Sequence, residues 1–189
     1  MKIRSLFPFG AVALLALAVP PAVPAQVNGF YAFAGLINDY TPSTVSPAGP
    51  WEIRGTWSLL LKGESGKADF TADLNMTRSD YWVVLNPASV NNDTSTGRNP
   101  HTHHIFMKDA TVAIATSTCS GVQVSGPVTV RANGGVAPFD VNGPSSLSVC
   151  VTGGTYVPFS NVALTFTGPA SGHFGSSPVH GIVRDVSGH

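Results

Sequence analysis

The sequence predicts an all-β fold: a single-domain antiparallel β-sandwich or small β-barrel with long loops, preceded by a cleaved signal peptide. Three observations support this prediction. Apolar and polar residues alternate with a period of two in many short segments, which is typical of strands that bury one face. The chain contains 20 glycines and 15 prolines, which cluster at the ends of these segments and indicate turns. No segment after Ala25 shows a helical period over three turns.

Residues 1–25 have the layout of a secretory signal peptide. Lys2 and Arg4 precede the apolar run GAVALLALAV, and small residues and prolines follow it up to Ala25. A membrane anchor is the alternative, but the run is shorter than the roughly 20 apolar residues that a membrane span needs. We therefore expect cleavage after Ala25, one domain over residues 26–189, and a secreted or periplasmic location.

Strand candidates follow one another along the rest of the chain. In residues 67–76, alternate residues are apolar and the residues between them are polar, and residues 51–61 alternate in the same way as far as Ser58. We expect the strand at 103–116 to contain a β-bulge. Because many short strands separated by turns occur in both sandwiches and barrels, both architectures remain open. The expected strands are residues 30–37, 51–61, 67–76, 81–86, 103–116, 121–132, 146–151, 162–168 and 179–186.

Two segments, residues 38–50 and 86–100, are expected to be long loops. Long loops in compact domains are often functional, and the second one leads directly into a group of histidines.

The composition restricts the partners. Charged residues make up 11% of the chain, and ten Lys and Arg residues balance ten Asp and Glu residues. No basic stripe with interleaved aromatic residues is present, so we expect no nucleic-acid partner. We also expect no membrane association after signal cleavage, and the sequence does not indicate an oligomeric state.

The two cysteines, Cys119 and Cys150, both lie in the part that we expect to be exported. An even number of cysteines in an oxidising compartment favours one disulfide. Two buried free thiols are the alternative.

The histidines are the main functional signal. Five of the six form two groups: His101, His103 and His104, then His173 and His180. On a strand, His101 and His103 would share one face with their Cα atoms about 6.6–7 Å apart, so that their rings can bind one ion, whereas His104 would face the other way. We therefore predict that these five histidines include the ligands of a metal site, with copper or zinc as the metal.

The second group would complete this site. We expect His173 on a glycine-rich loop and His180 at the start of the last strand, and Asp109 and Asp185 are candidate oxygen ligands or partners that orient a ring. Because a metal needs the neutral imidazole, affinity should fall below the usual histidine pKa of about 6.5.

Other functions remain open, and no catalytic residue is identified. The histidines could be exposed residues without a specific role. The chain could be a small-molecule or carbohydrate-binding domain that uses the 86–100 loop and aromatic residues. It could also be a barrel-type enzyme in which a histidine performs acid–base chemistry with a neighbouring side chain. The residues considered for these two alternatives are Trp51, Trp57, Asp80, Tyr81 and Trp82.

Two short strings, HTHHIF (101–106) and GHFGSSPVHG (172–181), resemble the copper/zinc superoxide dismutases. That family places a His-x-His pair on a strand of a β-sandwich and further histidines on a glycine-rich loop. The resemblance implies that His101 and His103 are copper ligands, that His173 takes the bridging position and that His180 takes a zinc position. It also implies a superoxide-dismutase-like metalloenzyme.

Overall fold

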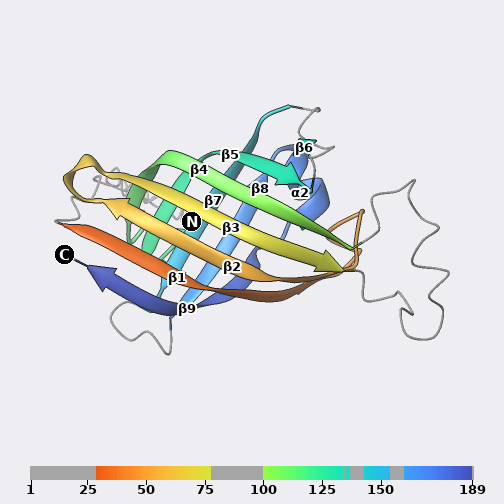
Figure 1. The fold of residues 1–189 in the computed structure, drawn as a ribbon, viewed down its shortest axis with the longest axis horizontal. Helices are drawn as coiled ribbons and strands as arrows, with labels where there is room; N and C mark the ends of the chain where they lie inside the picture. Colours follow the sequence, from red (N-terminus) through yellow and green to blue (C-terminus); the bar gives the residue numbers. More distant parts are fainter. Residues whose placement is uncertain (1–28, 78–99, 134, 137–142, 154–159, 189) are drawn as a thin grey trace, which may run out of the picture.

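The computed structural model describes residues 29–77, 100–133, 135–136, 143–153 and 160–188, and these form an all-β fold (Figure 1). Eight antiparallel strands close into a barrel, so of the two predicted architectures the barrel is the one observed. Among the described residues, no helix is long and apolar enough to cross a membrane. The expected signal peptide and the expected strand at 81–86 lie outside the described residues.

Each of the remaining predicted strands corresponds to a strand of the barrel, although the first and last residues differ. β1 continues into the segment that was expected to be a loop, and β4 begins two residues earlier than expected, at the first histidine. The barrel strands are β1 (Phe30–Thr41), β2 (Trp51–Lys62), β3 (Lys67–Thr77), β4 (His101–Ile114), β5 (Val122–Ala132), β7 (Ser145–Thr152), β8 (Asn161–Thr167) and β9 (Val179–Gly188).

Three short elements were not predicted. A 3-10 helix, η1 (Gly63–Ser65), joins β2 to β3, and β6 (Gly135–Val136) pairs with the end of β5. A helix, α2 (Pro169–Phe174), lies between β8 and β9.

The strands follow an up-and-down order around the barrel. Apart from the short β6, each strand pairs with its neighbour in the chain, and β1 pairs with β9 to close the ring. β4 pairs with β5 over two stretches, and β5 then pairs with β7. Each of these eight strands therefore has a paired neighbour on both sides, and none of them is a free edge of the sheet.

The core fills the inside of the barrel because alternate residues of each strand point inward. β3 shows this clearly, since its buried and less buried residues alternate along its whole length. Inside the barrel, the Trp57 and Phe70 rings stack with centroids 6.4 Å apart. The buried residues of β3 are Ala68, Phe70, Ala72, Leu74 and Met76.

The predicted bulge in the long histidine-bearing strand is confirmed. The register of β4 shifts against both β3 and β5, and Asp109 has a φ of 52°. The Asp109 N–H donates to Asp69 Oδ1 at 2.9 Å, and Lys62 Nζ lies 2.6 Å from Asp109 Oδ1. Because two residues separate the inward-facing Met107 and Ala110, both halves of β4 present their apolar side chains to the core.

The predicted disulfide is also confirmed. Cys119 and Cys150 are bonded with their Cα atoms 5.7 Å apart, so the bond joins the connection after β4 to β7.

Candidate metal centre

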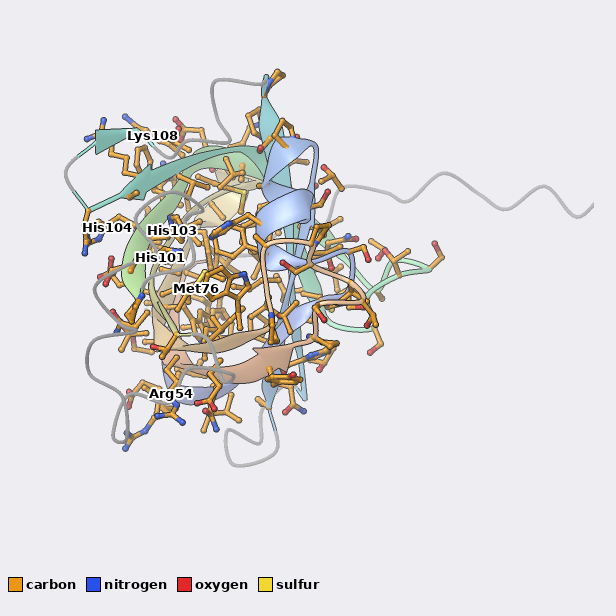
Figure 2. The ribbon with its side chains drawn as sticks, turned by 90° about the vertical axis from the view of Figure 1, so that its right-hand side faces the viewer. Arg54, Met76, His101, His103, His104 and Lys108 are labelled. Atoms are coloured by element: carbon orange, nitrogen blue, oxygen red, sulfur yellow. A yellow bond between two sulfur atoms is a disulfide. The ribbon has the colours of Figure 1, made fainter. Side chains whose placement is uncertain are left out.

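The His-x-His pair lies at the first residues of β4, at the end of the barrel where β3 finishes. His103 is buried and His101 is half-buried, and both share the inward face with Ile105. Across the strand pair, His101 lies opposite Met76 and His103 lies opposite Leu74. Figure 2 looks toward this end of the molecule and shows His101, His103 and Met76 together inside the ring of strands, with His104 outside it.

The third histidine comes from α2, which the sequence analysis expected to be a glycine-rich loop. Gly168, with a φ of 71°, precedes the helix, and Pro169 occupies its first position, where the missing N–H costs nothing. Gly175, with a φ of 109°, ends it, and a Cβ there would lie 2.7 Å from Thr41 Cγ2. Gly168 and Gly175 thus flank the six-residue helix that carries His173.

Three contacts fix this short helix on the barrel. The buried Phe174 ring stacks on Phe166 with centroids 4.2 Å apart. The Ala170 N–H donates to Ser145 Oγ at 3.1 Å. The buried Ser46, in the connection between β1 and β2, donates its hydroxyl to the His173 carbonyl at 2.6 Å. Sequence reasoning missed Ser46, because a single serine in a polar loop gives no distinguishing signal.

The three imidazoles converge on one point. His173 Nε2 lies 3.1 Å from His101 Nε2 and 2.9 Å from His103 Nε2. Ligand atoms of the three residues all lie within 4.8 Å of one another. Ring nitrogens that bind a tetrahedral ion at about 2.0–2.1 Å are about 3.3 Å apart, so small movements would bring them to metal-binding distances.

His173 Nε2 is shared between the two other histidines. A neutral imidazole has one N–H and one ring nitrogen with a lone pair. His173 Nε2 contacts two other Nε2 atoms, so it cannot form a complete hydrogen bond with each of them. A cation at the centre would accept a lone pair from all three nitrogens and remove this conflict.

Aromatic and apolar side chains surround the triad of His101, His103 and His173. The buried Trp51 ring lies 5.1 Å from the His101 ring and 5.6 Å from the His173 ring, measured between centroids. The Phe174 ring lies 5.2 Å from the His103 ring. These contacts shield part of each ring from water.

This environment determines the protonation of two of the rings. Burial is the main factor that lowers the pKa of His103 to about 3, and the neighbouring His173 and His101 rings lower it further; a backbone hydrogen bond with Arg131 opposes the change. Burial, followed by the proximity of His101, lowers the pKa of His173 to about 3. Both rings are therefore neutral at physiological pH, the form that binds metals.

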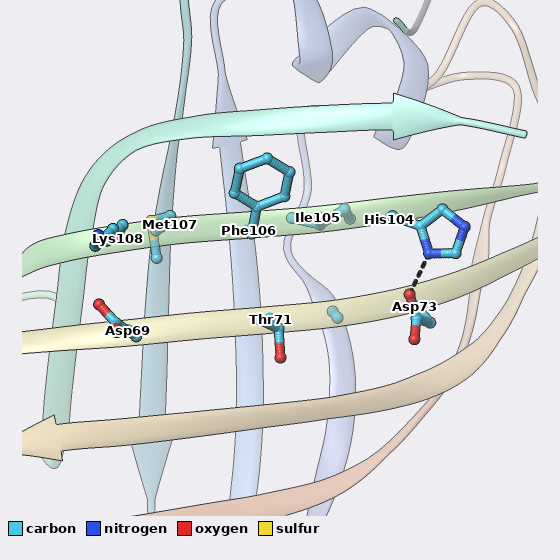
Figure 3. Close-up of a pocket in the computed structure, with 9 residues that line it drawn as sticks. Asp69, Thr71, Asp73, His104, Ile105, Phe106, Met107 and Lys108 are labelled. Carbon is cyan, nitrogen blue, oxygen red and sulfur yellow. Dashed lines mark hydrogen bonds and ion pairs between the residues drawn. The ribbon is translucent and has the colours of Figure 1, made fainter. Parts of the chain in front are cut away.

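The structure does not bring the two other predicted histidines into this group. His104 points out of the barrel, and its Nδ1 lies 2.5 Å from Asp73 Oδ1. His180, at the start of β9, is exposed and contacts Asp39 Oδ2 at 3.2 Å. Figure 3 shows the His104 pair at one end of an open groove on the outer face of β3 and β4, which Phe106 and Lys108 also border.

The other candidate residues also lie elsewhere or outside the described part. Asp109 pairs with Lys62 at the bulge, and Asp185 is exposed on β9. Neither belongs to the metal-binding group found among the described residues. Trp51 and Trp57 are buried in the barrel and do not form an exposed sugar-binding face. The candidates outside the described residues are Asp80, Tyr81, Trp82 and nearly all of the 86–100 loop.

The arrangement also differs from the one that the superoxide dismutase resemblance implies. The fold is a closed barrel, and the described residues contain one group of three histidines, without His180. In comparisons with protein-family models, curated proteins and solved structures, no match was found.

Proposed function

We propose that this chain is an exported protein that binds a transition metal ion through His101, His103 and His173. The observation that carries this proposal is the convergence of three Nε2 atoms, from a strand and from a helix about 70 residues later, inside one end of the barrel. Two of these rings are kept neutral by burial, which prepares them to bind metal without releasing a proton.

The donor set favours copper or zinc. Three imidazoles and no carboxylate form the group among the described residues, and imidazole nitrogens suit zinc and copper, whereas calcium and magnesium prefer oxygen ligands. Three protein ligands leave a fourth position on a tetrahedral ion. The proposed role is metal binding.

Export is part of the proposal. The N-terminal layout of Lys2, Arg4 and an apolar run supports signal-directed secretion, with residues 26–189 as the mature domain. The Cys119–Cys150 disulfide supports a secreted or periplasmic location, because such bonds persist in oxidising compartments.

Titration calorimetry with Zn(II) and Cu(II) on chelator-stripped, tag-free mature protein tests the site. We expect one ion per chain. His101→Ala should reduce the affinity by at least about tenfold, because it removes one of three ligands. His173→Gln should have a similar effect and tests the ligand from the helix.

His104→Ala is the matched control, because His104 lies on the same strand but faces outward. It should leave the affinity within about twofold of the original. Binding no tighter than about millimolar, or equal losses in His101→Ala and His104→Ala, would show that the triad is not a metal site.

A further inference from the structure

We infer that Met76 supplies a fourth ligand to the triad and that the site is selective for copper in its cuprous state. This inference rests on the proposed metal-binding function and specifies its metal.

The strand register places Met76 beside the triad. Met76 is directly opposite His101 in the β3–β4 pair, and both side chains are on the inward face. Directly opposed residues have Cβ atoms about 4.5–5.5 Å apart, and the flexible methionine side chain can adjust its sulfur position within this space. Met76 is fully buried, and Figure 2 shows it beside His101 and His103.

The thioether changes the selectivity of the site. Sulfur ligands are soft and prefer Cu(I), whereas three imidazoles alone suit Zn(II) and Cu(II) as well. A site of three histidines and one methionine provides four donors of the kind that a cuprous ion accepts.

The absence of negatively charged ligands in the described group also favours a monovalent ion. The four donors are three imidazoles and a thioether, none of which carries a negative charge, and no Asp or Glu joins the group among the described residues. The cost of moving an ion out of water rises with the square of its charge, so a divalent ion here costs about four times as much as a monovalent one. Cu(I) therefore fits this apolar site without an anionic ligand.

Trp51 is a further uncharged neighbour of the site. Its ring centroid lies 5.1 Å from that of His101 and 5.6 Å from that of His173, so it flanks two of the ligands without bringing a negative charge into the site.

Two variants separate the role of the sulfur from packing. Met76→Leu removes the sulfur at similar volume, and Met107→Leu makes the same change at another buried, inward-facing position, on β4. Cu(I) affinity is measured anaerobically by competition with a coloured cuprous chelator, and Zn(II) affinity is measured by calorimetry. Met76→Leu should weaken Cu(I) binding by at least about tenfold and weaken Zn(II) binding by a much smaller factor, whereas Met107→Leu should change neither.

X-ray absorption of the Cu(I)-loaded, unsubstituted protein provides a test that does not depend on a variant. We expect nitrogen scatterers together with one sulfur scatterer. Zn(II) binding to the triad combined with nitrogen-only copper coordination, or an unchanged Cu(I) affinity in Met76→Leu, would overturn the inference and leave the metal site standing. Failure to bind either ion would overturn both proposals.

Discussion

Acid should destabilise the metal-free protein over a pH range that the imidazoles of the buried His103 and the half-buried His173 determine. His103 and His173 have pKa values of about 3 in the folded protein, whereas an imidazole in the unfolded chain has the ordinary value of 6.5. Between these values the unfolded chain binds up to two more protons than the folded chain. The free energy of unfolding should therefore be highest above about pH 6.5 and should fall as the pH decreases toward 3.

The size of the effect follows from these pKa values. One pKa unit corresponds to about 1.36 kcal/mol, and pH 5 lies about 1.5 units below the pKa of the unfolded ring. Each ring should therefore cost about 2 kcal/mol at pH 5, and both together about 4 kcal/mol. Asp69, whose pKa is lowered from 3.8 chiefly by its hydrogen bond with Lys62, affects stability only at still lower pH.

Urea unfolding at about pH 7.5, 6 and 5, with a chelator present, measures this loss. The double variant His103→Leu/His173→Gln should lose most of the dependence, whereas His104→Gln, on the outer face, should keep it. Equal free energies of unfolding at pH 7.5 and 5 in the original protein, or an undiminished pH dependence in the double variant, would refute the explanation by buried imidazoles.

Ser46→Ala removes the hydroxyl that donates to the His173 carbonyl, so it should lower the free energy of unfolding by about 1–3 kcal/mol and weaken metal binding measured by calorimetry. Ser58→Ala, on the exposed outer face, is the control and should change neither. Reducing the Cys119–Cys150 bond should lower the free energy of unfolding by about 3–4 kcal/mol, because the bond joins residues with a sequence separation of 31. The fall in melting temperature measures this loss. Intact mass of the secreted protein should show a chain that begins at Gln26, and a mass that retains the first 25 residues would contradict export by signal cleavage.

Local alternation predicts the strands well because it reflects which side chains a strand buries. Residues 67–76 illustrate this, since each apolar position of the pattern is inside the barrel. Closure is a different property. It depends on the pairing of β1 with β9, two strands that lie near opposite ends of the chain. Alternation within each strand is the same in a sandwich and in a barrel. The sequence therefore left these two architectures open.

Only part of the candidate site could be predicted from the sequence. A period of two places His101 and His103 on one face of β4 and His104 on the other, as the structure has them. His173, on α2, could be suggested as a ligand only because it is a histidine. A six-residue helix is too short to show a helical period, and its glycines suggested a loop. The support that Ser46 gives to this helix depends on a contact 127 residues away, which no local pattern contains.

If the triad binds a metal as proposed, folding and metal loading are coupled, and this changes how acid should release the ion. The sequence alone suggested that affinity falls below a pKa of about 6.5, through protonation of the ligands. Since His103 and His173 have pKa values of about 3 in the folded protein, protons compete little for these two ligands at pH 5. Acid acts instead on the unfolded chain, at a cost of about 4 kcal/mol at pH 5, which an ion present at about 1,000 times its Kd would offset. The loaded protein should therefore stay folded at a pH where the metal-free protein is weakened. Affinity at pH 5, measured under conditions where the metal-free protein is still folded, should therefore fall far less than it would if all three ligands were ordinary imidazoles of pKa about 6.5. A fall of that full size while the barrel is intact would contradict this explanation.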